Sequence, residues 1–179
     1  TTVTLSRAEK VDFTLMTFVT GGSLLSLANS NVNALSDVAG KSVAVVTGTT
    51  SEAALQKALT KNLIDAKVVP VASREEAMKQ LDAGQVVAFA SDQIVLIGQI
   101  IRSADPRKYS LGRELFSYEP YAFVVRRDDS DFRLVANRAL AQIYRTGQIE
   151  QVFSRWFGQA GIKPSPVLTA MYALQSLPE

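Results

Sequence analysis

Cysteine and histidine are both absent from the 179-residue sequence. Without cysteine the chain forms no disulfide, thiolate metal site or catalytic thiol. Without histidine it lacks the commonest general base and the commonest metal-binding side chain. Serine–histidine catalytic triads and histidine zinc sites are therefore excluded for this chain.

Strong charge and long apolar runs are also lacking. The 19 basic and 17 acidic residues give a net charge of +2, and no run gathers the basic residues, so we expect no nucleic-acid partner. No apolar run approaches the roughly 20 residues of a transmembrane helix. No signal peptide precedes Thr1, so we expect a mature or trimmed chain. The composition, 47% hydrophobic and 20% charged, is typical of a globular protein of one domain or two small ones.

The middle of the chain alternates short apolar strands with amphipathic helices. This alternation, with short connections, predicts an open α/β sheet with parallel strands. The expected strands cover residues 42–46, 67–71 and 86–90, and the expected helices cover 51–62, 73–84 and 92–102.

One turn within this region has the features of an anion-binding site. The segment Val45-Val-Thr-Gly-Thr-Thr-Ser-Glu52 leads from a strand end into the first turn of a helix, where backbone N–H groups and the helix dipole favour a carboxylate or phosphate. Thr49 and Glu52 also have the spacing of a capping box. An ordinary helix cap is the alternative interpretation.

Asp92 follows the third predicted strand. Ligands of open α/β sheets bind beyond the carboxyl ends of the strands, and both Asp92 and the turn at residues 47–50 fall there. The turn offers donors to an anion and Asp92 offers a carboxylate to a cation, so together they suit a zwitterion. Alternatively, Asp92 only caps its own helix.

The flanking regions carry weaker signals. The glycine pair Gly21-Gly22 interrupts the apolar run 18–27, which predicts either a hinge or a bulge. Pro120 favours an edge or crossover strand. Two helical patterns at 132–143 and 149–157 carry Phe132, Phe153, Trp156 and Phe157, whose aromatic rings we expect in the core or between helices.

Several short motifs follow one another in order along essentially the whole chain. They are Thr1-Thr2 with Arg7 and 11–14, then 35–41, 45–52, 81–84, 87–92, 121–126 and Trp156-Phe157. Each motif is weak alone, but their order and spacing resemble the extracytoplasmic amino-acid-binding proteins of ABC importers, the two-lobed type called solute-binding family 3. The motifs at 45–52 and 87–92 look most like the glutamate/aspartate-binding branch.

The resemblance implies a binding site for the two charged ends of an amino acid. Arg7 matches the arginine that binds the α-carboxylate, for which its planar fork is suited, and Thr2 matches a first-lobe contact to the same group. Thr49 and Thr50 match the second-lobe helix end that completes the carboxylate site. Asp92 matches the carboxylate that receives the α-ammonium group.

Arg74 is a further hypothesis. It stands where the acidic-ligand branch can place a polar contact, so we expect it to meet the distal carboxylate of glutamate or aspartate. The alternative is a solvated arginine in the first turn of a helix.

The resemblance also implies the fold. We expect an α/β fold, periplasmic-binding-protein-like type II, with one complete open-sheet lobe plus the C-terminal part of the other. Residues 1–23 would be a remnant of lobe 1 with the first hinge crossover, 24–120 lobe 2, and 121–179 the second crossover and the C-terminal helices of lobe 1. Because most of lobe 1 is missing, we expect a truncated or proteolysed chain, or one completed by a second chain or a swapped copy.

The implied function is binding rather than catalysis. We expect a periplasmic protein that binds glutamate or aspartate by hinge closure and delivers it to the membrane subunits of an ABC transporter, with no enzyme activity, cofactor or metal. Three alternatives remain: a ligand-binding region of a membrane sensor or receptor, a dehydratase on the same scaffold, and a fragment that has lost ligand binding.

Overall fold

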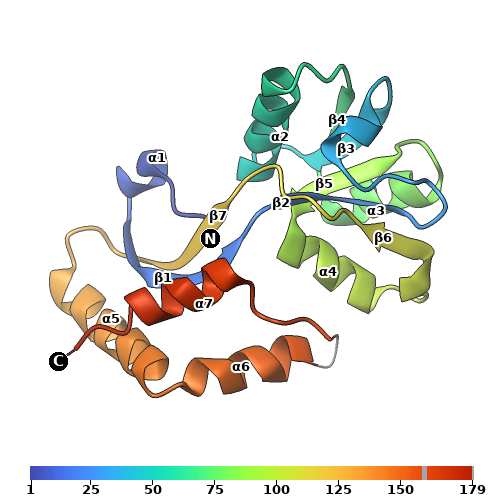
Figure 1. Ribbon diagram of the computed structural model, residues 1–179. Helices are drawn as coiled ribbons and strands as arrows, with labels where there is room; N and C mark the ends of the chain where they lie inside the picture. Colours follow the sequence, from blue (N-terminus) through green and yellow to red (C-terminus); the bar gives the residue numbers. More distant parts are fainter. Residues whose placement is uncertain (159–160, 179) are drawn as a thin grey trace. The chain divides into compact units, whose positions relative to one another are not determined.

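The computed structural model describes residues 1–158 and 161–178, which form two compact units (Figure 1). Unit 1 combines Thr1–Val19 with Pro120–Glu179, and unit 2 is the continuous segment Thr20–Glu119. The chain therefore passes from unit 1 into unit 2 and back again.

Unit 2 contains a five-stranded sheet in the order β4-β3-β5-β2-β6. β3 pairs in parallel with β4 and β5, and β2 pairs antiparallel with β5 and β6. The parallel arrangement predicted for the alternating region is thus confirmed, and the antiparallel β2 makes the sheet mixed. The strands are β2 (Gly22–Leu27), β3 (Ser42–Val46), β4 (Lys67–Val71), β5 (Ala88–Asp92) and β6 (Tyr109–Leu111).

Helices cover both faces of this sheet. Val43 and Val45 of β3 pack in one buried cluster with Leu55 of α2, whereas Ala44 packs in a second cluster with Leu81 of α3 and Leu96 of α4. This alternation follows from the two-residue period of a strand buried on both faces. The helices are α2 (Thr50–Lys61), α3 (Arg74–Asp82) and α4 (Gln93–Arg102), with two short 3₁₀ turns, η1 (Leu35–Val38) and η2 (Pro106–Lys108).

The helix cap predicted at Thr49 is present, and Ser73 caps α3 in the same way. The Thr49 and Ser73 hydroxyls accept hydrogen bonds from the N–H groups of Glu52 (3.2 Å) and Glu76 (3.1 Å). The reciprocal bonds differ from a standard capping box, because the Glu52 carboxylate accepts from the N–H of Gly48, one residue before the N-cap. The Glu76 carboxylate makes the equivalent bond one residue before Ser73.

The glycine pair Gly21-Gly22 is explained by close packing. A Cβ added at Gly21 would lie 2.2 Å from the Ser117 carbonyl oxygen, and one at Gly22 would lie 2.2 Å from the Phe116 ring. Gly22 also exchanges backbone contacts with this segment, donating to the Ser117 hydroxyl and accepting from the Phe116 N–H. A bulge is therefore not needed to account for the pair, and its use as a hinge stays a prediction.

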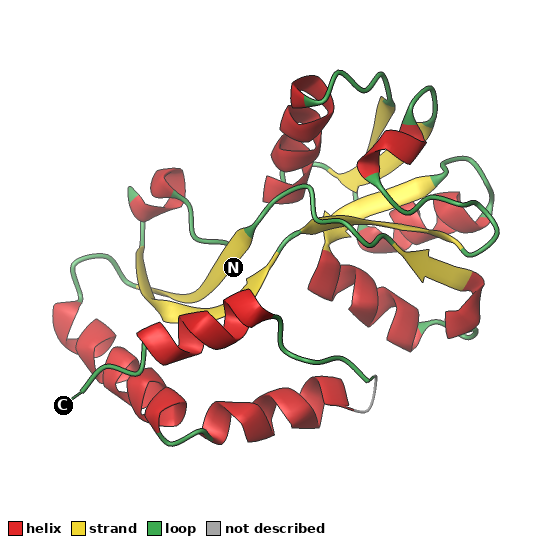
Figure 2. Cartoon of the chain, in the orientation of Figure 1, coloured by secondary structure: helices red, strands yellow, loops and turns green. Residues whose placement is uncertain are grey.

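The described residues of unit 1 form two strands and four helices. Figure 2 shows these elements in red and yellow. β1 and β7 pair with each other, and Thr2 adds an antiparallel bridge to Tyr121 of β7. The short helix α1 lies between Thr2 and β1. The elements are α1 (Leu5–Ala8), β1 (Asp12–Thr20), β7 (Glu119–Val125), α5 (Ser130–Arg145), α6 (Gln148–Phe157) and α7 (Pro166–Leu174).

Side chains from α5 and the C-terminal segment cover one edge of β1. The Tyr144 and Tyr172 hydroxyls donate to the carbonyl oxygens of Met16 and Thr17, and the Gln175 side-chain oxygen accepts from the Met16 N–H. These bonds replace the neighbouring strand that an exposed edge would otherwise recruit.

The predicted burial of the aromatic side chains is correct only in part. Phe153 is buried and stacks with Phe18 at a centroid distance of 6.3 Å. Trp156 and Phe132, however, are 70% and 55% exposed, so the prediction of core packing is wrong for these two. The physical reason is that Phe153 lies on the side of α6 that packs against Phe18 of β1, whereas the described residues leave Trp156 and Phe132 largely uncovered.

Candidate functional site

Two of the sequence-predicted features meet at one edge of the unit 2 sheet. β3 and β5 are parallel neighbours, so α2, which follows β3, begins beside Asp92, the last residue of β5. The Ser51 hydroxyl in the first turn of α2 donates a 2.8 Å hydrogen bond to Asp92 Oδ1, and both residues are buried. The turn at 47–50 and Asp92 are therefore joined, through a residue that the sequence analysis did not select.

The Asp92 carboxylate does not cap its own helix. Asp92 occupies the N-cap position of α4 without a side-chain capping bond. The first N–H groups of α4 are satisfied otherwise, since Gln93 donates to the Gly21 carbonyl and Ile94 donates to the Thr20 hydroxyl. The alternative role of Asp92 as a simple helix cap is thus excluded by the geometry.

The Thr49 side chain in the turn before α2 forms hydrogen bonds within that turn. The Thr49 hydroxyl donates to the Val46 carbonyl (2.7 Å) while accepting from the Glu52 N–H, and Gly48 adopts the left-handed backbone with φ of +74°. Thr49 therefore shapes the helix start, and the backbone of the first turn, which includes Thr50, is the feature suited to an anion.

Arg7 and Thr2 come together in unit 1. The Arg7 guanidinium donates through Nη1 to the Thr2 carbonyl at 2.7 Å and to the Thr1 hydroxyl at 3.1 Å. Thr2 itself is buried, 6% exposed. Among the described residues, no carboxylate forms an ion pair with Arg7. The arginine is thus anchored along one edge, and its charge is not neutralised by this part of the chain.

Arg74 lies at the same sheet edge as the α2 turn. It is the first residue of α3, which follows β4, and β4 runs parallel to β3. Its side chain is exposed. Beside it, hydrogen bonds from the Glu75 backbone and the Ser73 side chain lower the pKa of Glu75, and the Arg74 charge adds to that effect. The fold therefore leaves both roles of Arg74, ligand contact and solvated arginine, compatible with its position.

The predicted site residues are divided between the two units. Thr2 and Arg7 belong to unit 1, whereas Thr49, Thr50, Arg74 and Asp92 belong to unit 2. Within unit 2 the first turn of α2 lies beside the Asp92 carboxylate, and within unit 1 Arg7 bonds to Thr2.

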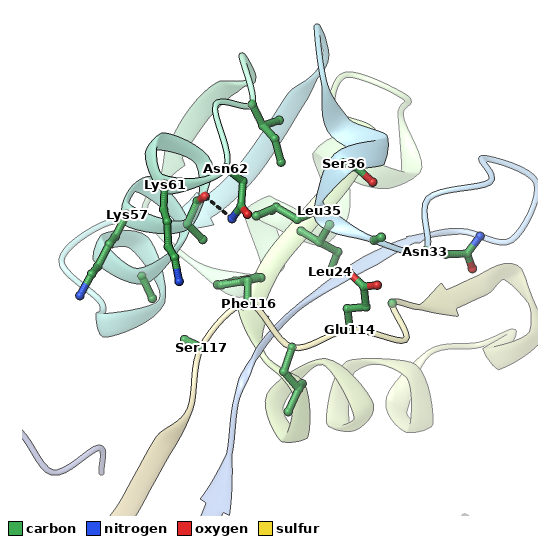
Figure 3. Close-up of a pocket in the computed structure, with 16 residues that line it drawn as sticks. Leu24, Asn33, Leu35, Ser36, Lys57, Lys61, Asn62, Glu114, Phe116 and Ser117 are labelled. Atoms are coloured by element: carbon green, nitrogen blue, oxygen red, sulfur yellow. Dashed lines mark hydrogen bonds between the residues drawn. The ribbon is translucent and has the colours of Figure 1, made fainter.

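A separate cavity of about 790 Å³ lies in unit 2 between α2 and the segment 112–117 (Figure 3). Leu24, Leu35 and Phe116 give it an apolar surface, and Lys61 and Glu114 stand on facing walls. None of the six predicted site residues lines it. It is therefore distinct from the sheet edge at which Ser51 and Asp92 meet.

The described residues contain neither a candidate metal site nor a candidate membrane span. No group of three or more acidic, cysteine or histidine side chains is arranged to hold a metal ion in residues 1–158 and 161–178. None of the helices in the described part of the chain combines the length and apolar character of a membrane span.

Sequence comparison matches residues 1–159 to the family "Bacterial extracellular solute-binding proteins, family 3". The chain is 30% identical over 159 residues to the L-glutamate/L-aspartate-binding protein of Pseudomonas aeruginosa, covering 89% of this chain and 53% of that protein. It is 28% identical over 157 residues to the glutamate/aspartate import solute-binding protein of Salmonella typhimurium, covering 88% and 52%. The chain thus spans about half the length of the curated relatives it matches.

The chain is also similar to solved structures of amino-acid-binding proteins. An ancestral arginine-binding protein bound to glutamine superposes with a TM-score of 0.73 at 29% identity, over 88% of this chain and 68% of that one. The ancestral amino-acid-binding protein AncCDT-1, described as a precursor of cyclohexadienyl dehydratase, superposes with a TM-score of 0.70 at 25% identity, over 87% and 65%.

Proposed function

Because the chain belongs to family 3 of the bacterial extracellular solute-binding proteins and has their type II α/β fold, we propose that it binds glutamate or aspartate for an ABC importer. Ligand contacts come from Arg7 and Thr2 of one lobe and from Thr49, Thr50, Asp92 and Arg74 of the other. The lobes correspond to the proposed division into 1–23 and 121–179 on one side and 24–120 on the other.

The junction of the α2 first turn with Asp92 carries this proposal. It places a helix N-terminus, which attracts a carboxylate, beside an acidic side chain that is held away from its own helix. An α-amino acid presents a carboxylate and an ammonium group on a single carbon atom. The sheet edge of unit 2 therefore offers a partner for each charged end of such a ligand.

Arg7 supplies the second half of the carboxylate site. Its Nη1 is committed to Thr1 and Thr2, which fixes the guanidinium and leaves its Nε and Nη2 donors without acceptors in the described part of the chain. A carboxylate bound there completes the hydrogen bonding of the fork. In this mechanism ligand contacts from both lobes stabilise a closed form, which the transporter recognises, and no bond of the ligand is broken.

The acidic specificity rests on two supporting observations. Relatives named for glutamate and aspartate share up to 30% identity with the chain, and Arg74 lies at the same sheet edge as the amino-acid contacts. A distal carboxylate that reaches Arg74 would distinguish glutamate and aspartate from glutamine or arginine. The periplasm is the location that follows from this role.

Unit 1 leaves several large apolar side chains exposed. Phe123, Val135 and Trp156 are 61%, 63% and 70% exposed in unit 1, and an apolar cavity of about 270 Å³ lies beside Phe123 and Trp156. We propose that the remainder of lobe 1 covers this face, supplied by the same polypeptide, by a second chain or by a swapped copy. The half-length coverage of the relatives supports this completion.

Titration calorimetry on the complete polypeptide tests the function. L-glutamate and L-aspartate should bind with saturable heat, and L-glutamine and L-arginine should bind at least tenfold more weakly. Arg7→Ala and Asp92→Ala each leave one ligand charge unpaired, so each should cost about 3 kcal/mol, or roughly 100-fold in affinity.

Exposed residues of the same types provide controls. Arg107→Ala and Asp65→Ala remove matched charges far from the proposed contacts and should leave the affinity unchanged. An Arg7→Ala variant that binds glutamate as tightly as the wild type would overturn the assignment of the carboxylate site.

The dehydratase alternative has one supporting neighbour, the precursor AncCDT-1, which is itself described as an amino-acid-binding protein. Release of phenylpyruvate, formed from prephenate by loss of water and CO2, would favour it. We expect no product with the complete polypeptide under conditions in which glutamate binds.

A further inference from the structure

We propose that Ser51 is a positioning residue that directs the Asp92 carboxylate toward the ammonium group of the bound amino acid. The proposal rests on the function proposed above and adds a residue that touches no ligand atom itself. Its basis is the 2.8 Å hydrogen bond from the Ser51 hydroxyl to Asp92 Oδ1, between residues 41 positions apart in the chain.

The bond between Ser51 and Asp92 is buried and therefore shielded from water. Ser51 is 4% exposed and Asp92 is 6% exposed, so water does not compete freely for the carboxylate. A hydrogen bond to a charged acceptor in such a setting is stronger than one between neutral groups. Serine has a single rotatable bond before its hydroxyl, and Ser51 lies in the first turn of α2, so the direction of the donor is set by the helix.

The position of Asp92 explains why such a donor is needed. An aspartate at an N-cap ordinarily turns back to the N–H groups of its own helix. In this structure Thr20 and Gly21 take up the N–H groups of Ile94 and Gln93, and Ser51 binds Asp92 from the other side. Both arrangements have the same effect: they keep the Asp92 carboxylate from bonding to the first N–H groups of α4.

The bond also links the two halves of the amino-acid site in unit 2. Ser51 belongs to the helix turn that suits the ligand carboxylate, and Asp92 receives the ligand ammonium. A direct bond between them holds these two contacts at a fixed spacing. Loss of the Ser51 hydroxyl should therefore weaken ligands that carry an ammonium group and spare those that lack one.

The test compares L-glutamate with glutarate, which keeps both carboxylates and has no amino group. In calorimetry on the complete polypeptide, Ser51→Ala should lower the affinity for L-glutamate about tenfold and leave that for glutarate unchanged. Ser51→Thr keeps a hydroxyl and should restore most of the affinity. Thr60→Ala removes another α2 hydroxyl, one that bonds only to Gln56 of its own helix, and should match the wild type.

A double-mutant cycle with Asp92→Asn separates positioning from a general structural role. If Ser51 acts through Asp92, Ser51→Ala should cause little further loss in the Asp92→Asn background. Equal weakening of glutamate and glutarate by Ser51→Ala would overturn the proposal, since it would show damage to the helix end as a whole.

The outcomes distinguish this inference from the function on which it rests. If the wild type binds glutamate, Asp92→Asn weakens binding and Ser51→Ala does not, the positioning role is wrong and the function stands. If the wild type binds no amino acid at all, the function is wrong and the role of Ser51 falls with it.

Discussion

At the scale of single residues, Arg7 is the proposed contact to a ligand carboxylate. One nitrogen of its guanidinium is fixed by Thr1 and Thr2, which limits the conformational entropy that ligand binding would otherwise remove. The remaining donors of the planar fork can then bind both oxygens of a carboxylate. A point charge on a flexible stem cannot reproduce that geometry.

The variant Arg7→Lys should therefore lose affinity although the charge is kept. We expect roughly a tenfold to 100-fold weaker binding of L-glutamate by the complete polypeptide, because a lysine makes no bidentate contact. Arg107→Lys, on an exposed turn, is the matched control in the same calorimetric titration. Wild-type affinity in Arg7→Lys would show that only the charge matters.

Gly22 is needed because its lack of a side chain leaves room for the Phe116 ring. A methyl group there would meet the Phe116 ring at 2.2 Å, so Gly22→Ala should lower the free energy of unfolding by about 1–3 kcal/mol. Gly98→Ala in α4 is the control, because nothing lies within 4 Å of its added Cβ and alanine favours the helix. Urea unfolding of both variants compares them, and an unaffected Gly22→Ala would contradict the packing explanation.

At the scale of elements, Asp82 connects the end of α3 to the start of β6. Its carboxylate accepts a hydrogen bond from the Tyr109 hydroxyl (2.8 Å) and pairs with Lys108 (2.6 Å). Burial alone would raise the pKa of Asp82, but the hydrogen bonds from Lys108 and Tyr109 outweigh it and lower the pKa below its ordinary value of 3.8. The same contact and burial raise the pKa of Tyr109 to about 12.

The lowered pKa of Asp82 predicts a specific acid dependence. Its contribution to stability is present above pH 3.8 and is lost as the pH falls through the lower folded-state pKa. Asp82→Asn should therefore flatten the fall in unfolding free energy below about pH 4, measured by urea unfolding at several pH values. Asp65→Asn, on an exposed loop, should keep the wild-type slope, and an unchanged slope in Asp82→Asn would contradict the linkage.

At the scale of the whole molecule, the two units differ in how their apolar side chains are buried. Unit 2 has a sheet covered on both faces by helices and two buried clusters. The described residues of unit 1 form two strands, a small buried cluster around Phe153, Leu168 and Met171, and several exposed aromatic side chains. Exposed apolar surface that is contiguous marks a place where other structure packs.

The isolated 179-residue chain should therefore bind the hydrophobic dye ANS, and the complete polypeptide should bind much less. Trp156→Glu should reduce the dye fluorescence of the isolated chain, since Trp156 lines the apolar cavity of unit 1. Leu63→Glu is the control, because Leu63 is 93% exposed but lies in unit 2. Equal fluorescence of the isolated chain and the complete polypeptide would argue that this face is never covered.

Much of the architecture follows from the sequence by itself, because it depends on neighbours in the chain. Local sequence is enough to predict the caps at Thr49 and Ser73 and the buried strand 42–46. Helix starts and strand periodicity depend only on residues a few positions apart. Residue types also exclude whole chemistries, as the lack of cysteine and histidine does here.

Tertiary structure decided what depends on residues far apart in the chain. The bond between Ser51 and Asp92 exists because β3 and β5 are neighbours in the sheet, and no local pattern distinguishes Ser51 from an ordinary first-turn serine. The need for glycine at 21 and 22 arises from a segment about 95 positions away, at Phe116 and Ser117. The exposure of Trp156 depends on how much sheet lies beside α6. Strand order and packing partners are long-range properties, so the sequence determined the elements and their chemistry, and the fold decided which side chains meet.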